Sequence, residues 1–270
     1  MTVMDSRTMT RPQTLYKYRA LSGSAREHTM KIICESELWF AKPSEFNDPF
    51  ECQAKINIDE FREKLPNLGE EHVPDLIENY RADIRESLRV LSLSELNDDL
   101  LMWGHYGDCH RGLCIGFDVT TEGQWFGSSK PVVYSSELPI ISGDPESIFE
   151  SVALSKAANW AYEKEWRVAE FDCEQARKFP NELLVEIIFG CDISDADRLE
   201  VLRELFFRSK LVQVYQARRR RLSYGLEIVY VGNVARSRII GPDGTLDVPL
   251  AEDEMEKLLA KIHEKSAISV

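Results

Sequence analysis

The chain has 270 residues, of which 43% are hydrophobic and 10% aromatic, so it is long enough to bury a large core. Its formal net charge of -13 argues against a general polyanion-binding surface, because such binding needs clustered lysine and arginine side chains. No apolar run approaches the roughly eighteen residues of a membrane-spanning helix, and the first residues contain no apolar signal segment. We therefore expect a cytoplasmic protein without a membrane partner.

The six cysteines form no C-x-x-C pair and are scattered along the chain, as is typical of reduced thiols in a large intracellular protein. Two histidine–cysteine pairs have a spacing that suits metal ligands on a continuous helix: His105 with Cys109, and His110 with Cys114. Glycines interrupt any such helix at positions 107 and 112, and no second ligand pair is present elsewhere. We therefore expect no metal.

The first ordered element is predicted to be a short aromatic strand at residues 14–19, after a loose tail at residues 1–13. Alternation along this strand puts Tyr18 on one face and Arg19 on the other. The next predicted elements are an amphipathic helix at 26–36, a strand at 37–41, a polar loop at 42–51, a helical insertion at about 57–91 and, near its end, a short strand at 91–93.

In the middle of the chain, Asp98-Asp99 is expected to cap a helix at residues 100–106. The helix should stop at Gly107 and be followed by a buried strand. The remaining predicted elements are strands at 112–119, 131–134, 184–190, 211–217 and 226–231, and helices at 148–161, 195–208 and 252–263.

Short strands of mixed spacing, with helices between them and no serial βαβ rhythm, predict an α+β fold. We expect a mixed, mostly antiparallel split sheet with flanking helices. A single domain should span residues 14–248, and residues 249–270 should form a C-terminal helical segment.

The stretch from Ser155 to Phe171 contains two glutamates, Glu163 and Glu165, where a helix is predicted to give way to a strand. Residues two apart in an extended chain point from the same face, so both carboxylates should lie together beside Arg167. Like charges at short range raise each other's pKa, which makes this arrangement costly to bury. The alternative is a solvated surface turn.

Three other stretches contain candidate binding residues. Arg19 could offer a two-pronged contact to phosphate, or stack on tyrosine at a strand edge. Asn47 and Asp48 could tie their loop together or shape a pocket wall. His105 and Tyr106 could line a nucleotide pocket, although an ordinary buried histidine is the alternative.

A run of arginines, Arg218–Arg221, falls in a predicted hairpin connection. It is either a solvated turn or, with Lys210, a contact for phosphate on a macromolecule. The sequence contains no G-x-S-x-G elbow, no phosphate-binding P-loop motif and no G-x-G-x-x-G after a strand. Esterase, P-loop and dinucleotide-fold functions are therefore not supported.

Several motifs between about Leu15 and Gly190 together resemble the bacterial domain-of-unknown-function family numbered twenty-nine seventy-one. They are Tyr16-x-Tyr18-Arg19, Leu38-Trp39-Phe40, Phe46-Asn47-Asp48-Pro49-Phe50-Glu51, Met102-Trp103-Gly104-His105-Tyr106, Gly112-x-Cys114-x-x-Phe117 and Lys156-x-x-x-Trp160-x-x-Glu163-x-Glu165-Trp166-Arg167.

The order of the motifs is also similar to that of ADP-ribosyltransferases of the Arg, Ser, Glu type. The resemblance implies that Arg19 grips the pyrophosphate of NAD and that Glu165 is the catalytic carboxylate, assisted by Glu163. Ser44 lies near the position of the family's serine motif, but K-P-S-E-F-N-D-P replaces its S-T-S pattern. The nicotinamide half of such a site is therefore left without its usual residues.

Our leading hypothesis is an enzyme that uses NAD or a related nucleotide as substrate and cleaves or transfers at its N-glycosidic bond. It would act as a bacterial toxin or defence effector on a protein or nucleic-acid acceptor. The residues expected to bind the nucleotide are Arg19, Tyr18, Asn47, Asp48, His105, Tyr106, Trp160 and Arg167. The alternatives are a non-catalytic nucleotide-sensing or protein-interaction module, and a metal-dependent nuclease that uses Glu163, Glu165 and Asp48.

Overall fold

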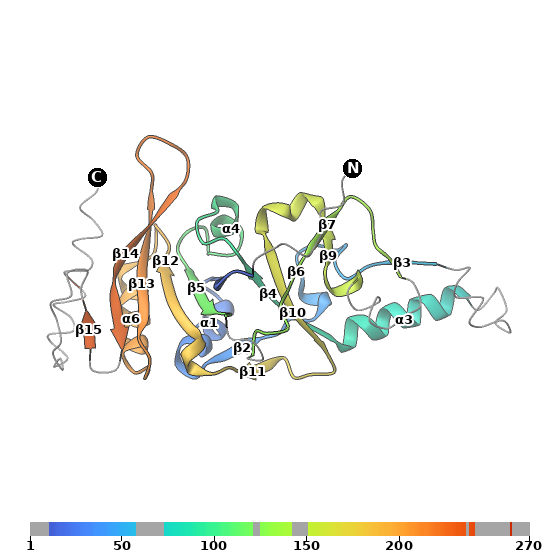
Figure 1. Cartoon of the computed structure of the whole chain (residues 1–270), viewed down its shortest axis with the longest axis horizontal. Coiled ribbons are helices and arrows are strands. Elements are labelled where there is room, and N and C mark those ends of the chain that lie inside the picture. The colour runs from blue at the N-terminus through green and yellow to red at the C-terminus, as the bar shows by residue number, and fades with distance from the viewer. Residues whose placement is uncertain are drawn as a thin grey trace.

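The computed structural model describes residues 11–57, 73–120, 125–141, 151–235, 238–240 and residue 260. The predicted tail lies outside these residues up to position 10, and so does the predicted helix at 252–263 except for residue 260. Within the described chain, one large sheet carries the core and helices cover parts of it (Figure 1).

The main sheet has nine strands. In spatial order they are β15 (Arg238–Ile240), β14 (Leu226–Ala235), β13 (Val212–Arg219), β12 (Leu184–Phe189), β5 (Leu113–Asp118), β1 (Thr14–Arg19), β4 (Leu88–Ser94), β10 (Glu165–Phe171) and β6 (Lys130–Pro131). Only β12 and β13 run parallel; the other neighbours in this sheet are antiparallel. The predicted α+β class with a mixed, mostly antiparallel sheet is therefore confirmed.

The sheet opens between β1 and β4. These strands are registered at one position, Tyr16 opposite Ser94, whereas β1 pairs with β5 along its whole length. On the other side, β4 pairs with β10 along seven consecutive positions, from Ser94 opposite Glu165 to Leu88 opposite Phe171. The two parts of the sheet therefore separate beyond a single contact, and the functional site described below lies at this opening.

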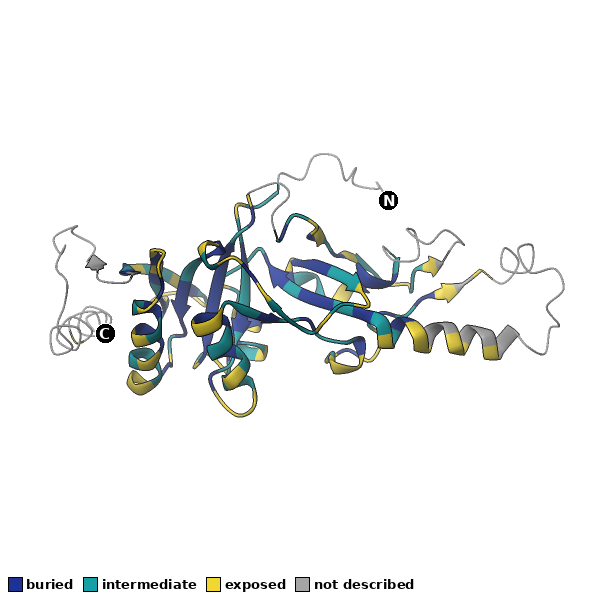
Figure 2. Cartoon of the chain, turned by 90° about the horizontal axis from the view of Figure 1, so that it is seen from below, coloured by how far each residue is buried: buried dark blue, intermediate teal, exposed yellow. Residues whose placement is uncertain are grey.

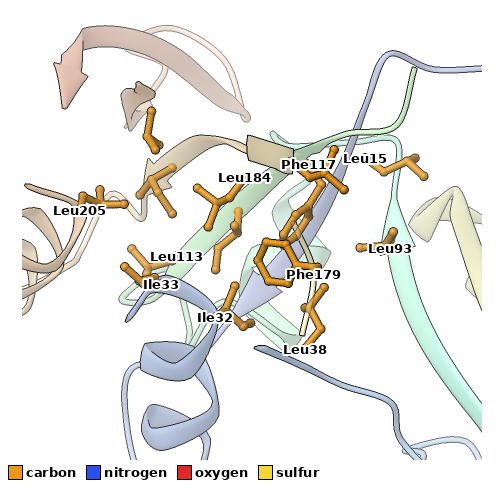
Figure 3. Close-up of a cluster of buried hydrophobic side chains, with 14 of the residues drawn as sticks. Leu15, Ile32, Ile33, Leu38, Leu93, Leu113, Phe117, Phe179, Leu184 and Leu205 are labelled. Carbon is orange, nitrogen blue, oxygen red and sulfur yellow. The ribbon is translucent and has the colours of Figure 1, made fainter. Parts of the chain in front are cut away.

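The largest core cluster packs two helices on the β5 and β12 side of the opening. Helix α1 (Ala25–Glu35) contributes Ile32 and Ile33, and α6 (Asp195–Phe206) contributes Leu205. Figure 3 shows these side chains pointing toward Leu113 and Leu184 of the sheet. Buried residues run through the main sheet, while exposed residues lie on the outer faces of the helices (Figure 2).

Local capping signals correctly predicted two helix starts. The Asp99 side chain accepts hydrogen bonds from the amides of the first turn of α4 (Leu100–His105), at 2.9 Å. The Ser194 side chain accepts one from the first turn of α6, at 3.1 Å. Helix α3 (Val73–Ser87) lies within the helical insertion predicted at about 57–91. The strand predicted at 91–93 is longer than expected, because β4 already starts at Leu88, within the predicted insertion.

Smaller elements surround the opening. They are three two-stranded sheets, β2 (Glu37–Trp39) with β11 (Ala176–Lys178), β3 (Lys55–Ile56) with β8 (Ile140–Ile141), and β7 (Val133–Ser135) with β9 (Ser155–Ala157), and three 3-10 helices, η2 (Pro43–Glu45), η4 (Ala158–Glu163) and η5 (Asn181–Leu183).

The predicted helix at 148–161 is helical at residues 151–153 but is not continuous beyond them. Helical turns at residues 151–153 end before β9, which pairs with β7, and η4 follows. Glu163 therefore ends a 3-10 helix, and Lys164 adopts a left-handed conformation with φ of 44° before β10 begins at Glu165. The two glutamates converge through this kink and not through strand alternation. The physical reason is the buried Lys156, whose ion pairs are described below.

A tight turn at residues 107–112 packs against the end of β12. Asp108, Cys109 and His110 all have positive φ, between 51° and 67°, and the amide of Gly190 donates to the carbonyl of Gly112 at 3.0 Å. A Cβ at position 190 would lie 2.1 Å from the carbonyl oxygen of His110. Only glycine fits this approach of two backbones.

We expect Gly190→Ala to lower the free energy of unfolding by about 1–3 kcal/mol, because the backbone oxygen must be displaced. The matched control is Gly104→Ala in α4, where a Cβ meets nothing within 4 Å. This change should be neutral or stabilise by about 0.5–1 kcal/mol, since alanine loses less backbone entropy in a helix. Urea titration of both variants measures the difference. Equal stabilities would contradict the predicted clash.

Candidate functional site

A cavity of about 260 Å³ lies at the opening between β1 and β4. Eight of the ten predicted site residues line it: Tyr18, Arg19, Asn47, Asp48, Tyr106, Trp160, Glu163 and Glu165. His105 and Arg167 do not line it. The lining also contains charged residues that were not predicted as site residues, among them Lys17, Glu51 and Lys156. Segments far apart in the sequence therefore meet here.

Lys156 lies among three carboxylates. Its Nζ is 2.6 Å from Glu163 Oε2, 3.1 Å from Glu165 Oε2 and 3.1 Å from Glu51 Oε1. All four side chains are almost fully buried, with exposed fractions of 4–6%. Such a charge can be buried only if it is paired and hydrogen-bonded. Lys156 is therefore the centre of a buried ionic cluster, and the strand β9 delivers it there.

Arg167 completes this ionic cluster from β10. Its Nε and Nη2 donate to the two oxygens of Glu165 at 2.8 and 3.0 Å, and its Nη1 donates to the carbonyl of Ala153 at 2.9 Å. Nη2 also pairs with Glu51. Three carboxylates thus face two cations, so the fully ionised cluster carries one excess negative charge. Arg167 supports the cavity from behind and does not reach a ligand in it.

The pKa values of the two predicted catalytic glutamates are shifted in opposite directions. Burial by itself would raise the pKa of Glu165, but Arg167 and Lys156 outweigh it and lower this pKa to about 2. For Glu163, burial dominates over the attraction of Lys156, and its pKa is raised above the ordinary 4.5. The excess negative charge of the cluster is therefore easiest to neutralise at Glu163.

Tyrosines hold both glutamates in place. The hydroxyl of Tyr106, at the end of α4, donates to Glu163 Oε1 at 2.8 Å. The hydroxyl of Tyr134 accepts from the backbone amide of Glu165 at 2.8 Å. Both oxygens of Glu165 accept from cations, whereas Glu163 shares its oxygens between Lys156 and a neutral phenol. Of the two carboxylates, Glu163 is the less strongly neutralised.

The strand β1 brings positive charge to the cavity. Lys17 Nζ donates to the carbonyl of Ser92 on β4 at 3.1 Å and so bridges the opening of the sheet. Burial, and then repulsion by Arg19, lower the pKa of Lys17 to about 7. Arg19 donates to Thr29 Oγ1 at 3.2 Å and to the carbonyl of Ala25 at 3.3 Å, which fixes it against α1. Lys17 and Arg19 are two residues apart in this strand, so alternation puts them on the same face. This spacing could have predicted Lys17 as a site residue.

The predicted polar loop forms another wall. Asp48 Oδ1 accepts from the amide of Phe50 at 2.9 Å, and Oδ2 accepts from Trp160 Nε1 at 2.8 Å. Asp48 thus ties the loop and also fixes the indole of Trp160, over which Lys156 Nζ lies at 5.0 Å. His105 contacts the outer side of Trp160, with ring centroids 6.4 Å apart. Its part is to support an aromatic wall and not to line the cavity.

The carboxylates are not arranged as metal ligands. The ammonium group of Lys156 occupies the point at which a cation between Glu51, Glu163 and Glu165 would bind. In the described part of the chain, no group of three or more His, Cys, Asp or Glu residues is placed to hold a metal ion. Asp48 lines the same cavity as Glu163 and Glu165, but its Oδ2 accepts from Trp160 Nε1, and the three carboxylates do not converge on one point as metal ligands would.

A family described as "Protein of unknown function (DUF2971)" matches residues 102–168. The matched segment includes most of α4, all of β5 and the ionic cluster except for Glu51. No curated protein and no solved structure matches the chain. The expected likeness to ADP-ribosyltransferases has no support from these comparisons, and Ser44 is exposed and does not line the cavity.

Among the described residues, no helix is long and apolar enough to cross a membrane.

We expect Lys156→Met to lower the free energy of unfolding by about 3–5 kcal/mol at neutral pH, because buried carboxylates lose their central cation. The loss should shrink as the pH falls toward about 5, since protonation of Glu163, whose pKa is already raised, then removes part of the uncompensated charge.

The control is Lys178→Met, which removes an exposed lysine paired with Glu35 and Glu37 and should change stability little at either pH. Urea titrations at both pH values measure the effect. A stability loss that does not depend on pH would show that Lys156 acts through packing alone.

Proposed function

We propose that the cavity binds a nucleotide, with NAD as the favoured ligand, and that the protein cleaves or transfers at its N-glycosidic bond. The single observation that carries the proposal is the separation of charge in the cavity. Lys17 and Arg19 supply positive charge from β1, and the ionic cluster around Lys156 has one excess negative charge. A nucleotide has the matching pattern, with phosphate at one end and charge that develops at the ribose.

The chemistry follows from this pattern. Breaking the bond between ribose and nicotinamide leaves positive charge on the ribose, and nicotinamide departs with the bonding electron pair. A fixed carboxylate lowers the barrier if it stabilises that charge more in the transition state than in the ground state. Water or an acceptor group then attacks the ribose and gives up a proton. The buried cluster can supply the carboxylate because its negative charge is already held in place.

Glu163 is the better candidate for this carboxylate. Glu165 is held by a two-pronged contact to Arg167 and by Lys156, so its charge is largely neutralised. Glu163 has a raised pKa and a phenol on one oxygen, which leaves more negative charge available when it ionises. We therefore assign Glu163 the role of stabilising the ribose, and Glu165 the role of positioning Lys156.

The size of the cavity indicates which part of NAD it holds. Its volume of about 260 Å³ is below the usual 300–1,000 Å³ of sites that enclose a whole small ligand. The cavity would therefore take the nicotinamide riboside half, and the adenosine half would extend outward. Trp160 and Tyr106 line the cavity and offer faces against which a planar ring can pack.

A second candidate is a non-catalytic nucleotide sensor. It is favoured by the fact that every carboxylate oxygen of Glu163 and Glu165 already accepts a hydrogen bond. A pocket so fully paired would bind a nucleotide signal without acting on it, as in a bacterial defence module. The enzyme and the sensor differ in the expected effect of removing the charge of Glu163: only the enzyme would lose a chemical step.

We expect purified protein to release nicotinamide from NAD, and Glu163→Gln to slow the release at least about a hundredfold, because the amide cannot stabilise the ribose charge. Chromatography of the reaction measures free nicotinamide, with cell lysate added as a source of acceptors. The matched control is Glu170→Gln on the same strand as Glu165, whose partner Arg177 lies outside the cavity lining. It should leave the rate unchanged.

Binding is measured on the same variants. If Glu163→Gln binds NAD but does not release nicotinamide, the carboxylate acts in the chemical step. If the unaltered protein binds NAD but releases no nicotinamide under any condition, the enzyme proposal is wrong and the sensor proposal is supported. If the unaltered protein neither binds NAD nor releases nicotinamide, both proposals are refuted.

We also expect NAD to bind up to about tenfold more tightly at about pH 6 than at about pH 8. The pKa of Lys17, lowered to about 7, means that this amine carries its proton below pH 7 and loses it above. The pyrophosphate of NAD does not titrate in this range, so the dependence reports on the protein. Lys17→Arg should keep the affinity and remove the pH dependence, whereas Lys178→Arg should keep both. Calorimetric titration at each pH gives the dissociation constants.

A further inference from the structure

A second cavity, of about 610 Å³, lies beside the loop that joins β13 and β14. Figure 1 shows this loop projecting beyond the rest of the main sheet, at the upper left of the view. Its lining consists of Leu100, His110, Cys191, Arg219, Arg220, Arg221, Leu222, Ser223, Tyr224, Gly225 and Leu226. The cavity is therefore built mainly from the loop itself.

The lining of this second cavity is basic and contains no carboxylate. That is unusual for a chain with 46 acidic and 33 basic side chains. Arg219 pairs with Asp192, which lies outside the lining, and Arg220 Nε donates to the carbonyl of Leu226 at 3.1 Å. Both bonds fix the guanidinium groups, and Arg221 adds a further exposed charge. The second cavity therefore offers fixed positive charges to which an anion can bind.

The tip of the loop is fixed and apolar. The amide of Arg220 donates to the carbonyl of Gly225 at 3.1 Å, and Gly225 has a φ of 138° that favours glycine. Between these residues, Leu222 and Tyr224 are both 100% exposed. Such side chains add little to the stability of the fold and are fully accessible to a ligand.

We propose that the β13–β14 loop and its cavity bind single-stranded nucleic acid. The arginines contact backbone phosphates, and Tyr224 stacks on an unpaired base. Three consecutive arginines, Arg219, Arg220 and Arg221, line the cavity and offer more than one phosphate contact. A phosphate groove combined with an exposed aromatic ring is the usual means of binding a single strand. An acidic peptide would also match the arginines, but every nucleotide supplies a planar ring to stack on Tyr224, whereas most peptide residues do not.

The position of this site links it to the central cavity. The short helix α4 contributes Leu100 to the loop cavity, and Met102 and Tyr106 to the central one. A strand bound at the loop would therefore lie next to the proposed nucleotide site. The binding itself does not depend on the chemistry proposed there, so either proposal can fail alone.

The test is fluorescence anisotropy with a labelled single-stranded oligonucleotide of about 12 nucleotides, at several salt concentrations. We expect the unaltered protein to bind with an affinity that falls as salt rises. For Arg220→Ala/Arg221→Ala, the slope of log affinity against log salt concentration should become shallower by about 1.4, since each phosphate contact contributes about 0.7. Arg220→Lys/Arg221→Lys should retain most of the slope. Tyr224→Ala should weaken binding at least about fivefold without a change of slope.

The control is Arg85→Ala/Lys55→Ala, which removes the same charge from exposed residues on α3 and β3, far from the loop in Figure 1. It should bind as the unaltered protein does. No binding at low salt, or equal binding by the arginine variants, would refute the proposal. If a mononucleotide displaces the oligonucleotide at an equal concentration, the ligand of the loop is a free nucleotide and not a strand. Displacement by an acidic peptide with no dependence on Tyr224 would reassign the loop to a protein partner.

Discussion

The buried ion pairs of Lys156 are the constraint on which the site depends. They join β9, η4, β10 and the loop after η2, which are separated by up to about a hundred residues of sequence, at one point. Burying five charges has a large desolvation cost, and replacing such a cluster by apolar residues is often neutral or stabilising. Its presence at the wall of a cavity is therefore better explained by a use for fixed charge than by stability.

The irregular backbone around the cluster follows from the same constraint. Lys156 reaches the carboxylates because a three-residue strand interrupts what the sequence pattern indicates as a helix. Glu163 reaches it because Lys164 takes a left-handed conformation, which costs about 1–3 kcal/mol for a residue other than glycine. The geometry that the ion pairs require thus outweighs local preference at both positions. Strain of this kind is stored where the surrounding contacts over-determine the backbone.

This contrast explains how far the sequence could predict the structure. The strand at 14–19 and the helices capped by Asp99 and Ser194 depend on patterns within a few residues, and these predictions hold. Most of the predicted site residues line the cavity, because aromatic and charged residues cluster in short motifs, but more than half of the lining was not predicted. The pairing of Lys156 with Glu51 could not be predicted, because their contact arises only when the sheet is assembled. Without it, the local pattern favoured a continuous helix, and the choice of Glu165 as the catalytic carboxylate rested on the resemblance alone.

The distribution of charge reconciles an acidic protein with two proposed anionic ligands. At physiological ionic strength the Debye length is about 8 Å, so the net charge of -13 acts weakly on a ligand once it touches the surface. Local groups then decide the outcome. Lys17 and Arg19 at the sheet opening, and Arg219 and Arg220 of the projecting loop, are each fixed by bonds to backbone or to neighbouring side chains. Fixed cations lose little entropy when they bind phosphate, so short-range contacts can select an anion that the protein as a whole repels.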